Sequence, residues 1–149
     1  MRAGRRIAFD YGDVRIGVAI SDASGLLALP LDHIQNNSEN TLNDIGALFA
    51  EYEPIYIAIG FPIHLSGKAS AKSAAVEGFS SHLSGISNAP IYLIDERMTS
   101  VSAGRLLKEA GLNSKQARGE IDSQAAVAIL EAALNQERLQ GQPIRKFIK

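Results

Sequence analysis

Residues 7–22, IAFDYGDVRIGVAISD, decide the fold. Two runs rich in β-branched and aromatic side chains flank Gly12-Asp13, a dipeptide typical of tight turns. The pattern predicts strands over 5–11 and 14–20, folded back on each other as a hairpin. The first of these strands nevertheless contains an aspartate, and its position needs a physical explanation.

Asp10 stands at the end of the first predicted strand. Because side chains alternate along a strand, Ala8 and Asp10 point to one face, and Ile7 and Phe9 point to the other. Asp10 should therefore lie above the sheet, near the helices that cover it. A buried carboxylate is costly unless it is paired or bound to a metal. The simpler interpretation is that Asp10 only favours the turn that follows it.

The rest of the chain predicts an α/β fold. Further elements are predicted as a strand over 26–34, a helix over 42–52, a strand over 55–60, a helix over 69–83, a strand over 91–94, a helix over 99–110, a polar loop over 113–118 and a helix over 121–138. Three strands in succession, followed by alternating strands and helices, predict a mixed sheet. Its first strands are antiparallel and its later ones parallel, with helices on both faces.

Length and composition predict one domain spanning residues 1–149. Of the 149 residues, 46% are hydrophobic and 21% charged, as in globular proteins with a single core. The absence of cysteine excludes disulfides, thiolate metal sites and a cysteine nucleophile. No run approaches the ~20 apolar residues of a membrane helix, and the start resembles neither a signal nor a transit peptide. We therefore expect a soluble, cytoplasmic protein that binds no membrane.

The net charge of -1 conceals an uneven distribution. Residues 1–9 and 138–149 contain arginine or lysine but no acidic side chain. Such basic ends can contact phosphates while an acidic centre binds cations. Solvated tails are the simpler interpretation, and charge alone favours it.

Two other acidic positions can join Asp10. Asp95-Glu96 follows the predicted strand 91–94, and sites in sheets with parallel strands gather at the carboxyl ends of the strands. Asp122 opens the apolar stripe of the last helix, which continues at i+3, i+4, i+7, i+8 and i+11 and should face the sheet. The simpler interpretation of Asp95-Glu96 is a solvated strand end with an internal ion pair, and that of Asp122 is a helix N-cap.

Carboxylates that converge on one spot repel each other, and a divalent cation is the usual resolution. Oxygen ligands, with no cysteine and no histidines spaced for ligation, favour Mg²⁺ or Mn²⁺ over zinc. Two such ions about 3.5 to 4 Å apart can hold a phosphodiester, one activating water and the other stabilising the leaving oxygen. The coincidence of these acidic positions, rather than any one of them, indicates a nuclease.

Four segments match a known family in order. They are FDYGDVRIGVAISD at 9–22, GFPIHLSGKAS at 60–70, DERMTSVSA at 95–103 and EIDSQAAVAIL at 120–130. On these segments the chain resembles the YqgF/RuvX family of bacterial ribonuclease-H-fold proteins, described as pre-16S rRNA nucleases and earlier as Holliday junction resolvases. The resemblance implies a ribonuclease-H-like fold with a mixed five-stranded sheet, its first three strands antiparallel, and an acidic active site that binds divalent metal.

Carried over residue by residue, the resemblance makes Asp10, Glu96 and Asp122 the catalytic carboxylates and the ligands of Mg²⁺ or Mn²⁺. Asp95 adjoins Glu96 and should point to the opposite face if the strand continues through both, so it ranks second as a ligand. Arg15 and Arg97 are candidates for phosphate contact, because a guanidinium can hold two oxygens at once. The alternative for Arg97 is an ion pair with Asp95 or Glu96.

Three further basic residues are candidates for substrate binding. Lys68 adds charge before a predicted helix start, where free backbone amides can receive an anion, although a solvated lysine is the simpler interpretation. Lys115 and Arg118, in the predicted loop before Asp122, can follow a nucleic-acid backbone.

The leading hypothesis is a metal-dependent nuclease that hydrolyses phosphodiester bonds in the 5′-end maturation of pre-16S rRNA, with precursor rRNA and the small ribosomal subunit as partners. One alternative is a Holliday junction resolvase, for which a homodimer rather than a monomer is expected. A second is a non-catalytic nucleic-acid-binding module, against which the retained acids argue. A third is an actin-like nucleotide-binding lobe, which the length disfavours because such proteins close two lobes around the nucleotide.

Overall fold

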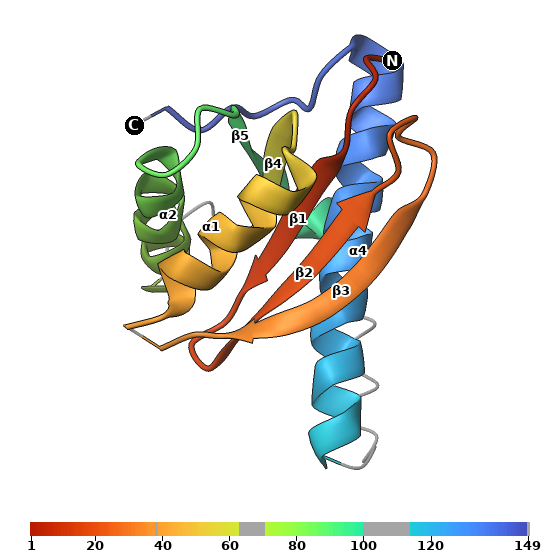
Figure 1. The fold of residues 1–149 in the computed structure, drawn as a ribbon. Coiled ribbons are helices and arrows are strands. Elements are labelled where there is room, and N and C mark those ends of the chain that lie inside the picture. The colour runs from red at the N-terminus through yellow and green to blue at the C-terminus, as the bar shows by residue number, and fades with distance from the viewer. Residues whose placement is uncertain (38, 63–70, 100–113, 149) are drawn as a thin grey trace.

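The computed structural model describes residues 1–37, 39–62, 71–99 and 114–148, and over 114–123 it describes the backbone alone. Its strands are β1 (Arg6–Tyr11), β2 (Arg15–Ser21), β3 (Ala28–Gln35), β4 (Tyr56–Phe61) and β5 (Ile91–Asp95) (Figure 1). The described helices are α1 (Thr41–Tyr52), α2 (Ala71–Ser84), the short 3-10 helix η1 (Glu96–Met98) and α4 (Ser114–Gln140). No helix in the described ranges is both long and apolar enough to cross a membrane.

The five strands form one mixed sheet in the order β3-β2-β1-β4-β5. β1 pairs antiparallel with β2, and β2 antiparallel with β3. β4 pairs parallel with both β1 and β5. The expectation of a mixed five-stranded sheet with its first three strands antiparallel is therefore confirmed.

The turn between β1 and β2 depends on Gly12. A Cβ atom at this position would lie 2.5 Å from the carbonyl oxygen of Arg15, a contact that no side chain tolerates. Asn36 holds the turn by donating from Nδ2 to the carbonyl oxygen of Gly12 at 2.7 Å. Gly12 therefore serves the tight reversal that folds the hairpin.

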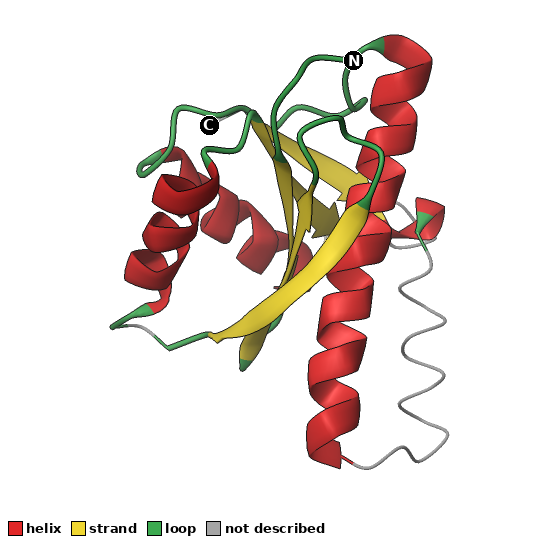
Figure 2. Ribbon diagram, turned by 45° about the vertical axis from the view of Figure 1, so that its right-hand side comes forward, coloured by secondary structure: helices red, strands yellow, loops and turns green. Residues whose placement is uncertain are grey.

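Helices cover both faces of the sheet, as predicted. Figure 2 shows the sheet between α1 and α2 on one side and α4 on the other. Ile7 and Phe9 of β1 belong to the apolar cluster shared with α1 and α2. Ala8 belongs to the cluster shared with α4. The alternation predicted for β1 is thus confirmed, and Asp10 belongs to the α4 face.

Small side chains let α4 lie close to the sheet. On the sheet side these are Ala8, Ala19 and Ala58, each fully buried. The predicted stripe of α4 faces them and is buried throughout, at Ala125, Ala126, Ile129, Leu130 and Ala133. The side chain of alanine is too small to hold a helix away from a sheet. The helix α4 therefore packs closely against β1, β2 and β4.

The predicted start of the last helix is wrong. The structure begins α4 at Ser114, so Lys115 and Arg118 lie on this helix and not in a loop. The segment 114–120 is polar, but lysine, glutamine, alanine, arginine and glutamate are good helix formers. Figure 1 shows this end of α4 extending past the sheet, where a helix needs no apolar stripe. The helix predicted over 99–110 lies outside the described residues except for Thr99, which caps the end of η1.

A buried ion pair ties the other end of α4 to the sheet. Arg6 is 0% exposed, and its guanidinium donates to both carboxylate oxygens of Glu137, at 3.1 Å from Nε and 2.6 Å from Nη2. Tyr56 donates its hydroxyl to Glu137 Oε1 at 2.9 Å. Burial, reinforced by the carboxylate, raises the pKa of Tyr56 well above its usual range. The solvated-tail interpretation of the basic N-terminus is therefore wrong for Arg6.

The C-terminal residues also belong to the fold. Leu93 of β5 donates its amide to the carbonyl oxygen of Arg145 at 2.8 Å, and Phe147 donates to that of Ile91 at 2.7 Å. Tyr92 and Lys146 form an antiparallel bridge. The C-terminal segment, defined here as residues 143–148, therefore covers the outer edge of β5 and is not a solvated tail.

Replacing Glu137 with glutamine should lower the free energy of unfolding by about 3 to 5 kcal/mol, because it leaves the buried guanidinium of Arg6 without a counter-charge. Urea unfolding of both proteins measures the loss. Glu131→Gln is the matched control, since Glu131 is exposed on the same helix and should change stability by no more than about 0.5 kcal/mol. Equal, small effects of both variants would contradict the importance of the pair.

Candidate active site

Asp10 lies in β1 between two glycines. Its partner in β2 is Gly17. β1 and β4 pair as far as Phe9 and Ile59, and continuing that register by one residue brings Asp10 beside Gly60. Asp10 is half-buried on the α4 face. A carboxylate flanked by glycines on both neighbouring strands has room for a ligand beside it.

Glu96 reaches the same face from the far side of β4. It follows the last residue of β5 and begins η1. Its Oε1 atom is buried and lies 3.6 Å from where a Cβ atom at Gly60 would stand. That Cβ would also lie 2.6 Å from Cδ1 of Ile129 on α4, which shows that Glu96 is turned toward the α4 face. Asp10 and Glu96 therefore approach Gly60 from its two neighbouring strands.

Gly60 lies next to Glu96, a proximity that the sequence pattern did not indicate. Any side chain here would require Ile129 of α4 to shift, and its Cβ atom would lie in van der Waals contact with the carboxylate of Glu96. The available signal is a glycine near the end of an otherwise apolar strand, which often marks the close approach of another group. A side chain at residue 60 would instead occupy the space beside the Glu96 carboxylate.

The backbone of Asp122 belongs to α4. It precedes Ile129 by seven residues, which is about two helical turns and about 10 Å along the axis. This places its backbone toward the N-terminal end of α4, while its side chain lies outside the described ones. Among the side chains that the structure describes, no three acidic or histidine residues form a group able to hold a metal.

Asp95 has a different role from Glu96. Its carboxylate caps η1 by accepting from the amide of Arg97 at 2.9 Å. It also pairs with the guanidinium of Arg97, with 2.7 Å between Nη2 and Oδ2. The hydrogen bond from Arg97 holds the pKa of Asp95 below its usual range, and the charge of Arg145 adds to this. The ion pair expected as the alternative role of Arg97 is thus present.

Of the residues predicted to contact substrate, the structure describes the side chains of Arg15 and Arg97. Arg15 begins β2 and is half-buried. The side chain of Arg97 is 54% exposed and keeps a surface open to solvent despite its pair with Asp95. Lys68 lies outside the described residues, and so do the side chains of Lys115 and Arg118.

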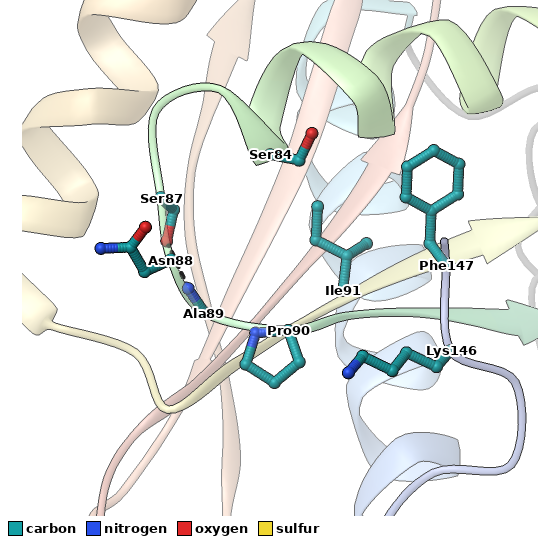
Figure 3. A pocket seen from close by; sticks show the side chains of 8 residues that line it. All are labelled: Ser84, Ser87, Asn88, Ala89, Pro90, Ile91, Lys146 and Phe147. Atoms are coloured by element: carbon teal, nitrogen blue, oxygen red, sulfur yellow. Dashed lines mark hydrogen bonds between the residues drawn. The ribbon is translucent and has the colours of Figure 1, made fainter. Parts of the chain in front are cut away.

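A cavity of about 280 Å³ lies elsewhere, between the end of α2 and the start of β5 (Figure 3). Ser84, Pro90, Ile91, Lys146 and Phe147 are among the residues that line it. None of its lining residues is acidic. The cavity opens at the opposite end of β5 from Glu96, so it is separate from the acidic site.

Comparison with known proteins decides the family. The RuvX model, described as a Holliday junction resolvase, matches residues 4–136. The chain belongs to the RuvX family. A relative from Streptomyces coelicolor, named "Putative pre-16S rRNA nuclease", is 43% identical over 145 residues, covering 96% of this chain and 87% of the relative. A relative of the same name from Streptomyces avermitilis is 41% identical over 143 residues, covering 95% and 92%.

Solved structures show the fold of this RuvX-family protein. RuvC of T. thermophilus, in complex with a Holliday junction substrate, matches with a TM-score of 0.58 and 13% identity, covering 96% of this chain and 99% of that one. A second Thermus thermophilus RuvC structure matches with a TM-score of 0.53. The expected ribonuclease-H-like fold is therefore confirmed.

Gly60→Ala should lower the free energy of unfolding by about 1 to 3 kcal/mol, because the added methyl group overlaps the buried Ile129. Adding Ile129→Val removes the Cδ1 atom that the new Cβ meets and should recover part of the loss. Urea unfolding of the two single variants and the double variant measures the coupling. Strictly additive losses would contradict the close packing described here.

Proposed function

We propose that this protein is a divalent-metal-dependent nuclease that hydrolyses phosphodiester bonds. The observation that carries the proposal is that Glu96 lies beside Gly60, while the register of β1 and β4 continues to Asp10 on the other side of that residue. Family membership and the relatives named as pre-16S rRNA nucleases support the same reaction class. Taking residues 1–149 as one ribonuclease-H-like domain, we assign the catalytic role to Asp10, Glu96 and Asp122.

The residues at this position suit Mg²⁺ or Mn²⁺. Both described carboxylates present hard oxygen donors, which these ions prefer. A side chain at residue 60 would intrude on the space beside Glu96, and glycine leaves it open. Asp10, Glu96 and Asp122 would hold the metal. When bound, it would polarise the phosphoryl oxygen and lower the pKa of a water molecule.

The protein itself contributes binding and orientation. Arg97 presents an exposed guanidinium next to Glu96, and a guanidinium can hold two phosphate oxygens in a fixed plane. Asp95 restrains that guanidinium in the absence of substrate. Arg15 begins the strand that pairs with β1, and it is the second candidate for backbone contact. Hydrolysis by in-line attack of water would leave a 5′-phosphate and a 3′-hydroxyl, with no covalent enzyme intermediate.

Precursor rRNA is the substrate that the names of the relatives favour. We therefore place the protein in the cytoplasm, acting on the 5′ end of pre-16S rRNA, with the small ribosomal subunit as partner. Branched DNA is the second candidate, because the family model is described as a Holliday junction resolvase. A resolvase must cut two strands symmetrically, so that function requires a homodimer.

Asp10→Asn should lose at least about 100-fold of its cleavage rate while remaining folded, because the carboxylate that holds the metal is gone. Asp13→Asn is the matched control: Asp13 is exposed in the adjacent turn, and its replacement should leave cleavage unchanged. Both variants and the parent are incubated with precursor rRNA, single-stranded RNA and a four-way DNA junction, in Mn²⁺ and in chelator.

The substrate cut by the parent ranks the two functions. Cleavage of precursor rRNA that stops on chelation is the expected result, whereas cutting of the junction alone would support the resolvase. Full activity of Asp10→Asn, or cleavage that persists in chelator, would overturn the proposed function.

A further inference from the structure

The C-terminal segment carries an arginine back to the acidic edge of the sheet. Hydrogen bonds between the backbones of Arg145 and Leu93, and of Phe147 and Ile91, fix the segment along β5. Its side chains alternate, and Figure 3 shows Lys146 and Phe147 leaving the segment in different directions. The position of Arg145 is therefore set by backbone pairing and not by a flexible tail.

Arg145 packs on the end of β4. Its guanidinium carbon lies 4.5 Å from the centre of the Phe61 ring. Phe61 pairs with Asp95 across β4 and β5. Because the strands β1, β4 and β5 are parallel, their carboxyl ends share one edge of the sheet. Phe61 belongs to the apolar cluster shared with α1 and α2, so Arg145 lies on that face, at the edge whose α4 face holds Glu96.

The charges at this edge are not balanced by Asp95. Its carboxylate is already engaged in the ion pair with Arg97. Both arginines are exposed. The two guanidinium groups therefore carry one positive charge more than Asp95 neutralises, and the carboxylate of Glu96 lies on the other face of the sheet. A planar cation held against an aromatic ring is also already oriented for a phosphate, and loses less rotational freedom on binding.

We propose that Arg145 is a substrate-binding residue that contacts a backbone phosphate of a nucleic-acid strand lying across the ends of β4 and β5. Arg97 and Arg145 then contact neighbouring parts of the same strand, on the two sides of Asp95. The proposal rests on the proposed nuclease function, since it adds a binding contact at the edge of the sheet that holds the acidic site. The bound nucleic-acid strand would then run past η1 toward the C-terminal segment.

The test measures binding apart from cleavage. A short fluorescein-labelled single-stranded RNA is titrated with protein in chelator, and anisotropy is followed at several salt concentrations. Arg145→Gln should weaken binding by about three- to tenfold and reduce the slope of log affinity against log salt by about 0.7, the value for one phosphate contact on a single strand.

Lys146→Gln is the matched control. It removes one positive charge from the next residue of the same segment, whose bridge partner is Tyr92 and not Leu93. It should change affinity by less than about twofold. Arg145→Lys keeps the charge and should restore most of the salt slope, and thermal unfolding of each variant checks that the segment is still attached to β5.

Equal affinity and equal salt slope for Arg145→Gln and the parent would overturn the proposal, as would equal losses in Arg145→Gln and Lys146→Gln. These outcomes are independent of cleavage. A parent protein that cuts RNA while Arg145→Gln binds normally refutes only this contact. A parent that binds RNA through Arg145 but cuts no substrate refutes only the proposed nuclease.

Discussion

The buried ion pair between Arg6 and Glu137 fixes where α4 lies along the sheet. Arg6 precedes Asp10 by four residues of β1, about 13 Å, and Glu137 follows Asp122 by fifteen residues of α4, about 22 Å. The pair is formed at 2.6 Å, and α4 runs antiparallel to β1. Measured from the pair along β1, the backbone of Asp122 therefore lies farther than Asp10, past the end of the sheet. Glu96 also follows the end of its strand, so both approach the same edge.

A second constraint acts across the sheet. Ala8, Ala19 and Ala58 let α4 approach closely, and Gly60 allows Ile129 to touch the strand itself. Small residues are costly in a strand because they bury little apolar surface, so their use on this one face has a reason. They let α4 pack closely against β1, β2 and β4.

Much of this arrangement is predictable from local pattern. The hairpin follows from its alternating apolar runs and turn, and the buried face of α4 from the spacing of Ala125, Ala126 and Ile129. Contacts between distant segments are not predictable in this way. Arg6 and Glu137 are 131 residues apart, and nothing local marks an arginine near the N-terminus as fully buried. Arg145 reaches Phe61 only because the C-terminal segment pairs with β5, and the polar start of α4 lacks the apolar stripe that signals a helix.

We propose that Asp10, Glu96 and Asp122 together hold a divalent cation. The most direct test is anomalous X-ray diffraction from crystals of the protein grown in Mn²⁺. We expect a peak within about 2.0 to 2.4 Å of a carboxylate oxygen of each of the three residues. Saturating Mn²⁺ that gives no peak between Asp10 and Glu96, or that binds only at other positions, would contradict it.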